Sequence, residues 1–149
     1  MVTNHIAMIG SEIILGLGMA VLAGPQPSQD GPIGHWINPA QSVVVEITNC
    51  GANSLCGHVL WASPEAANDA KAKGTDPLEG TALFRDFASS GDGKWKGRLF
   101  VPDMGKTSRA ELRVVDDRHL KITGCAVGRL LCKSQVWDRI DPVQLPVAD

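Results

Sequence analysis

The stretch that decides the fold is VVVEITNCGANSLCGHVLWA, residues 43–62. Apolar and polar residues alternate with a period of two on both sides of a Gly-Ala-Asn segment, the pattern of two half-buried β-strands joined by a turn. Val59 and Trp61 are expected to share the inward face of the second strand. Cys50 and Cys56 flank the turn, so this segment predicts a β-hairpin with a cysteine on each arm.

A second segment, GCAVGRLLCKSQVW at residues 124–137, repeats the arrangement with Cys125 and Cys132. Zinc sites prefer cysteines two to four residues apart with histidines at matching spacing, and catalytic redox pairs read Cys-x-x-Cys. Neither pattern is present. The four cysteines are therefore interpreted as structural disulfides, which are typical of small exported domains.

Further alternating runs follow the first hairpin, separated by short turns rich in Gly, Asp and Pro. Short connections imply antiparallel neighbours, and successive strands with few edge defences favour closure. We predict an all-β fold: a single antiparallel up-and-down β-barrel of about 7–8 strands. Ser63 as N-cap, Pro64 at the first helical position and Gly74 as the stop predict one short helix in the loop after the second strand. The remaining expected strands are residues 81–87, 94–101, 108–115, 118–125 and 131–140.

The pairing of the cysteines stays open. We expect strand ends to place all four at one end of the barrel. Local pairing, Cys50 with Cys56 and Cys125 with Cys132, is favoured because hairpin partners meet early in folding. In a closed barrel the last strand lies beside the first, so a crossed Cys50–Cys132 bond along the seam is the alternative.

Residues 1–23 resemble a signal peptide, with an apolar run at 13–23 and small residues before the expected cut after Ala23. An uncleaved anchor is the alternative, because the segment before the run has no Lys or Arg. The expected organisation continues with a linker at 24–33, the barrel domain at 34–141 and a C-terminal tail at 142–149. The protein is predicted to be periplasmic or secreted, with no extended membrane span in the mature chain.

The chain carries 14 basic and 16 acidic residues and no run of like charge. A nucleic-acid or anionic-membrane footprint needs a basic patch, and the sequence shows none, so no nucleic-acid partner is expected. His35, His58 and His119 are scattered over three elements, and no nucleophile is paired with a base in a known motif. We predict no catalytic residue, no metal site and no cofactor.

The domain begins with Gly34-His35-Trp36 and ends with Trp137-Asp138-Arg139. Since the first and last strands of an up-and-down barrel are neighbours, Trp36 is expected to plug one end with Arg139 across its indole face. Gly34, Trp36, Trp137 and Arg139 are thus the structural candidates. A Gly-x-Trp start with a late Arg is similar to the lipocalin pattern.

Four segments together carry a closer resemblance: GHWINP, VVVEITNCGANSLCGHVLW, WKGRLFVPDMGKT and LKITGCAVGRLLCKSQVWDRI. From residue 34 to residue 140 they resemble, in order, the bacterial domain-of-unknown-function family 2147. The resemblance implies an exported, lipocalin-like β-barrel of unassigned activity, and it implies no catalytic residue.

One face of the last strand reads Lys133, Gln135, Trp137 and Arg139, which is polar for an inward face. It is either solvent-facing or the polar wall of a cavity suited to a ligand with an anionic head. The leading hypothesis is a binding protein for a small apolar or amphipathic molecule. A structural protein of the cell envelope with a filled barrel and a protein partner is the second hypothesis, and an unrecognised enzyme the third. The expected ligand-binding residues are Trp61, Trp95, Leu99, Ile122, Lys133 and Gln135.

Overall fold

The computed structural model describes residues 31–126 and 131–142, together with Gly16, Gly18, Ala20 and Leu145. The predicted leader, the linker up to residue 30 and most of the C-terminal tail lie outside the described residues.

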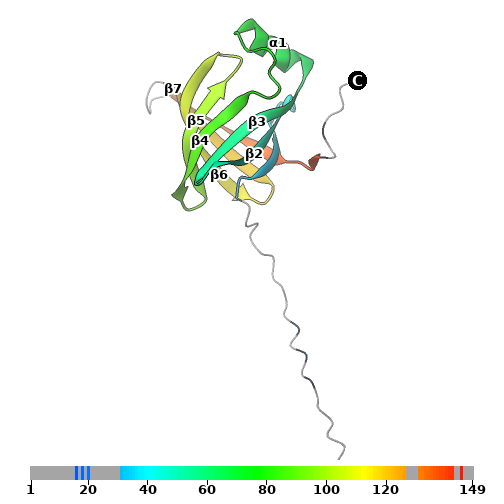
Figure 1. The fold of residues 1–149 in the computed structure, drawn as a ribbon, viewed down its shortest axis with the longest axis vertical. Coiled ribbons are helices and arrows are strands. Elements are labelled where there is room, and N and C mark those ends of the chain that lie inside the picture. The colour runs from blue at the N-terminus through cyan, green and yellow to red at the C-terminus, as the bar shows by residue number, and fades with distance from the viewer. Residues whose placement is uncertain are drawn as a thin grey trace, which may run out of the picture.

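The barrel is built from eight strands, each paired antiparallel with the next in sequence, and β8 pairs with β1 to close it (Figure 1). This confirms the predicted up-and-down barrel. The strands are β1 (Gly34–Ile37), β2 (Val43–Gly51), β3 (Ser54–Ala62), β4 (Ala82–Gly91), β5 (Lys94–Val101), β6 (Lys106–Asp116), β7 (His119–Ala126) and β8 (Leu131–Arg139).

The one helix in the described ranges, α1 (Pro64–Ala72), lies at one end of the barrel (Figure 1). Ser63 is its N-cap and accepts a hydrogen bond from the Ala66 backbone N–H at 3.1 Å. The helix follows the third strand and not the second, because the short segment Gly34–Ile37 is itself a strand. The prediction was one strand short at this point.

The strands alternate in direction, so the connections fall into two groups. The turns after β2, β4 and β6 lie at one end, called the closed end, with the segment 31–33. The connections after β1, β3 and β5, including α1, lie at the other, called the open end. At the closed end, Asp92 in the β4–β5 turn has a φ of 54° between two glycines that also have positive φ, the backbone of a tight hairpin.

Trp36 fills the closed end. Its ring is fully buried, and its Nε1–H donates to the Pro32 carbonyl at 2.8 Å. The Arg139 guanidinium lies 4.2 Å from the centroid of this ring and donates to the carbonyls of Ile33 and Gly31. Gly34 has a φ of 134°, and a Cβ there would collide with Arg139. The Gly-x-Trp start and the late Arg thus meet as one packing unit.

Candidate ligand-binding cavity

Interior side chains become smaller or more polar from the closed end to the open end. On β6 the inward positions run from Leu112, fully buried, through Ala110 to Ser108. Gly97 and Gly124 face the interior on the neighbouring strands, where an added Cβ would approach Phe87 and Leu99 respectively. Large residues therefore fill the closed half of the barrel, whereas the open half contains a cavity of about 2130 Å³.

Apolar side chains form one part of the wall of this cavity. Leu99 on β5 and Ile122 on β7 line it, together with Phe84 and Trp137. The rings of Phe84 and Trp137 meet edge to face, with centroids 5.8 Å apart. This part of the wall suits a hydrocarbon portion of a ligand.

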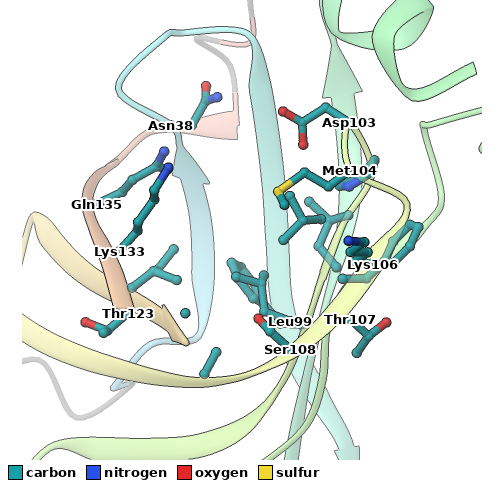
Figure 2. Close-up of a pocket in the computed structure, with 18 of the residues that line it drawn as sticks. Asn38, Leu99, Asp103, Met104, Lys106, Thr107, Ser108, Thr123, Lys133 and Gln135 are labelled. Atoms are coloured by element: carbon teal, nitrogen blue, oxygen red, sulfur yellow. The ribbon is translucent and has the colours of Figure 1, made fainter. Parts of the chain in front are cut away.

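The inward face of β8 supplies a polar part of the cavity wall, between Trp137 and the open end. Gln135 accepts a hydrogen bond from the Trp137 indole N–H at 3.0 Å through its Oε1 atom. This bond turns the Gln135 amide nitrogen away from the indole, and Lys133 follows two residues nearer the open end. Figure 2 shows both side chains extending from β8 with their polar ends toward the loop that holds Asn38. The wall therefore presents an ammonium and an amide N–H₂, which are hydrogen-bond donors.

The rim of the cavity is formed by loops of mixed character. Asp103 and Met104 lie in the β5–β6 connection, and Lys106 begins β6 beside them (Figure 2). Glu65 of α1 also borders the cavity. The Met104 side chain is 55% exposed, so an apolar group stands at the entrance beside charges of both signs.

A family model described as "Uncharacterized protein conserved in bacteria (DUF2147)" matches residues 34–139. The chain belongs to this family. The matched region contains every strand of the barrel and both cysteine hairpins, and the family description assigns no activity. No curated protein matches the sequence.

A solved structure from Helicobacter pylori, protein HP1028, described as belonging to the lipocalin family, is similar to this DUF2147 member. The TM-score is 0.57 at 14% sequence identity, covering 74% of this chain and 84% of that one. This likeness confirms the lipocalin-like fold.

Trp61 and Trp95, expected on the cavity wall, are not part of it. A register shift between Val44 and Val45 places Trp61 opposite Val44, while Val59 pairs with Val45. The extra residue of this bulge reverses the alternation, so Trp61 faces outward. Trp95 faces inward but lies at the closed end, where a Cβ at Gly31 would be 3.2 Å from its ring. The other four expected residues, Leu99, Ile122, Lys133 and Gln135, all line the cavity.

Trp137, expected to have a structural role, lines the cavity, as do Phe84 and Ser108, which no sequence motif singles out. The signal for Ser108 was present in its spacing. Ser108, Ala110 and Leu112 occupy alternate positions of one strand and change along it from polar to small to large and apolar. The direction of that strand, which is needed to interpret the gradient, comes only from the topology.

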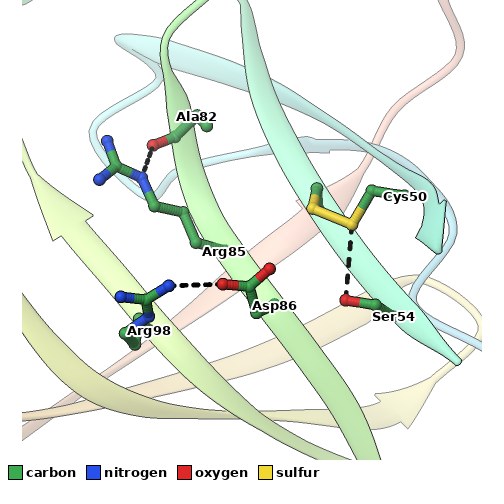
Figure 3. Close-up of a disulfide and its surroundings, with 7 residues drawn as sticks. Cys50, Ser54, Ala82, Arg85, Asp86 and Arg98 are labelled. Atoms are coloured by element: carbon green, nitrogen blue, oxygen red, sulfur yellow. Dashed lines mark hydrogen bonds and ion pairs between the residues drawn. A yellow bond between two sulfur atoms is a disulfide. The ribbon is translucent and has the colours of Figure 1, made fainter.

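The disulfides join Cys50 to Cys56 and Cys125 to Cys132, which is the local pattern. The expectation that all four cysteines lie at one end is wrong. Cys50 is near the end of β2 at the closed end, beside Ser54 (Figure 3), and Cys125 is near the end of β7 at the open end. An even-numbered and an odd-numbered strand of an antiparallel barrel end at opposite ends, so the crossed seam bond is excluded by geometry.

A cluster of three titratable groups lies outside the cavity, at the closed end. His119 Nδ1 is 2.7 Å from Asp116 Oδ1, and its Nε2 is 3.5 Å from Asp138 Oδ1. Hydrogen bonds from the Arg118 backbone N–H and from His119 hold the pKa of Asp116 below its usual value. All three side chains are substantially exposed, so this cluster ties the β6–β7 turn to β8 at the surface.

Among the described residues, no group of three or more His, Cys, Asp or Glu side chains is arranged so that it could hold a metal ion. None of the helices in the same ranges is long and apolar enough to span a bilayer.

Proposed function

We propose that the open half of the barrel binds one amphipathic small molecule, whose hydrocarbon portion contacts Leu99, Ile122 and Trp137 and whose anionic head is held by Lys133 and Gln135. The observation that carries the proposal is the gradient along β8, from the buried Trp137 to the donor groups of Gln135 and Lys133. Within the described part of the chain, no carboxylate forms an ion pair with Lys133, so its ammonium is available to a ligand.

The alternative of an envelope scaffold assumed a filled barrel. The cavity of about 2130 Å³ favours a binding protein instead, since drug-sized ligands occupy sites of about 300–1,000 Å³. The cavity is open at the rim, so a ligand longer than its depth can extend out between the loops.

The test compares two ligands of equal chain length, dodecanoate and dodecanol, by displacement of a dansylated fatty acid. Dodecanoate should bind the unmodified protein more tightly than dodecanol. Lys133→Met should weaken dodecanoate binding about tenfold and leave dodecanol unchanged, because a charge-assisted hydrogen bond contributes about 1.5–3 kcal/mol and solvent at the rim screens it.

Lys121→Met is the matched control, since it removes the same charge from the outward face of the neighbouring β7. It should leave both affinities unchanged. Binding of neither ligand would contradict the cavity proposal as a whole. Equal binding of the two ligands, unaffected by Lys133→Met, would contradict only the assignment of the anionic head.

We also propose that the chain acts in an oxidising compartment outside the cytoplasm. Two disulfides in a domain of this size support export, because cytosolic reductants keep thiols reduced. Fractionation of a bacterial host with alkylation of free thiols tests this. Recovery in the periplasmic fraction with all four cysteines protected is expected, whereas alkylated protein in the cytosolic fraction would refute it.

A further inference from the structure

The strand registers collect basic side chains on the outer face of β4–β7. Nearest the closed end, Lys94 pairs with Arg113, and Arg113 pairs with Lys121. One step toward the open end, Lys96 pairs with Glu111. Directly opposed residues share a face of the sheet, so these residues form two neighbouring rows that contain four cations and one carboxylate.

A third row continues the pattern. Arg85 pairs with Arg98, and Arg98 pairs with Arg109. Arg98 also forms an ion pair with Asp86 (Figure 3), and the Arg85 guanidinium lies 4.9 Å from the centroid of the Phe100 ring. We call these three rows together the basic face.

The side chains of the basic face point away from the barrel interior, although Lys96, Arg98, Arg109 and Glu111 also border the cavity. Gly97, which separates Lys96 from Arg98, faces inward against Phe87, and Ala110, which precedes Glu111, is buried in the core. Alternation along the strands therefore directs Lys96, Arg98 and Arg109 outward, where they are exposed.

The basic face carries seven basic and two acidic side chains, a net charge of +5, whereas the whole chain carries −2. Within the described residues, Arg98 with Asp86 is the one ion pair on this face. The absence of a basic patch, expected from the sequence, is therefore wrong for the folded chain. The cations come from alternate positions of four strands and never form a run in the sequence.

We propose that the basic face docks on the surface of an anionic phospholipid bilayer. Its rows spread in two dimensions, because neighbouring strands lie about 4.8 Å apart. A bilayer presents phosphates in two dimensions, whereas a nucleic-acid strand is a linear array that favours a groove with stacking aromatic side chains. Phe100, which is half-buried, is covered by Arg85.

An exposed apolar residue at the edge of the basic face supports the same partner. Val136 on β8 pairs with Lys121 and extends the row nearest the closed end, and it is 44% exposed. An apolar side chain beside cations suits the boundary between lipid headgroups and acyl chains. This docking uses no side chain assigned to the ligand and is independent of the cavity proposal.

Co-sedimentation of the full chain with vesicles tests the docking. The protein should bind phosphatidylcholine vesicles that contain phosphatidylglycerol, and binding should fall as salt is added. Binding to vesicles of pure phosphatidylcholine, which carry no net charge, measures any contribution of the N-terminal apolar run. This contribution is subtracted to give the charge-dependent binding. Changing Lys96 and Arg113 together to Gln should weaken the charge-dependent binding about 25-fold, since each cation near an anionic surface contributes about 1 kcal/mol.

Two further variants make the result decisive. Lys71→Gln with Lys73→Gln removes the same charge at α1, outside the three rows of the basic face, and should leave binding within about twofold. Glu111→Gln should strengthen binding about fivefold, a gain that misfolding cannot produce. Absence of charge-dependent vesicle binding, or an equal loss in both double variants, would overturn the proposal. Displacement of the protein from vesicles by a single-stranded oligonucleotide at lower concentration would assign the basic face to nucleic acid instead.

Discussion

Arg139 connects three parts of the chain that are distant in sequence. Its guanidinium stacks on Trp36 and donates to carbonyls of the segment before β1, while its Nε–H donates to the Asp117 carbonyl in the β6–β7 turn at 2.8 Å. Lysine cannot replace it here, because an ammonium lacks the planar fork that reaches several acceptors while stacking on a ring.

Trp36→Ala tests the importance of this unit. The ring is fully buried, so its removal should lower the free energy of unfolding by about 3–5 kcal/mol. Chemical denaturation followed by far-ultraviolet circular dichroism measures the loss. Trp61→Ala is the control, since Trp61 is only half-buried and faces outward, and should cost clearly less. Equal losses in the two variants would show that Trp36 has no special role in closing the barrel.

Asp116 should make folding sensitive to acid. Its pKa is lowered in the folded state, so the stability it contributes is fully present above the unfolded value of about 3.9 and is lost as the pH falls through the folded pKa. Carboxyl carbon NMR should give a midpoint below that of Asp in a model peptide. Asp116→Asn should lower stability at neutral pH, with the difference from the unmodified protein vanishing in acid. A midpoint at or above the ordinary Asp value would contradict this assignment.

Among the elements, β3 shows how one irregularity changes a surface. Its alternation predicts Leu55, Val59 and Trp61 on one face, but the bulge opposite Val44 and Val45 turns the last of them outward. Ala70 of the helix and Leu78 of the following loop are buried in the core, so this excursion is part of the packing and not a detached loop.

The start of α1 gives a prediction at the scale of the element. Ser63→Ala removes the acceptor of the Ala66 N–H and should reduce the free energy of unfolding by about 1 kcal/mol, as for other N-caps. Asn68→Ala, at an exposed position within the same helix, should be neutral or slightly stabilising, because Ala has the higher helix propensity. Denaturant midpoints of the two variants should therefore move in different directions or by clearly different amounts.

For the whole molecule, the disulfides lie at opposite ends of the barrel and act on separate loops. The two bonds span sequence separations of 6 and 7 residues, so the chain-entropy model gives each about 2 kcal/mol. Replacing both cysteines of one pair by Ser should lower stability by about that amount. Because the sites are far apart, the variant lacking both pairs should lose the sum to within about 0.5 kcal/mol. Strong non-additivity in denaturation would show that the two ends of the barrel are coupled.

The sequence by itself determined the class of fold, the family, the helix after the second cysteine and the meeting of Trp36 with Arg139. These features depend on short-range patterns: alternation along a strand, turn residues, a helix cap and the adjacency of first and last strands in a closed barrel. Each of these patterns can be recognised from a few neighbouring residues or from the order of the strands alone.

Only the tertiary structure decided which end of the barrel each disulfide occupies, on which side Trp61 lies, where the cavity opens and where the basic face gathers. The ends of the disulfides and of the cavity depend on the order and direction of the strands. The side of Trp61 and the basic face depend on the register between strands. Moving a strand by one residue exchanges its two faces, and a bulge does the same for part of a strand. Arg98 and Arg109 meet through the register of β5 with β6, and Arg85 and Lys121 join the same face through the registers of β4 and β7, which the pattern along any one strand does not contain.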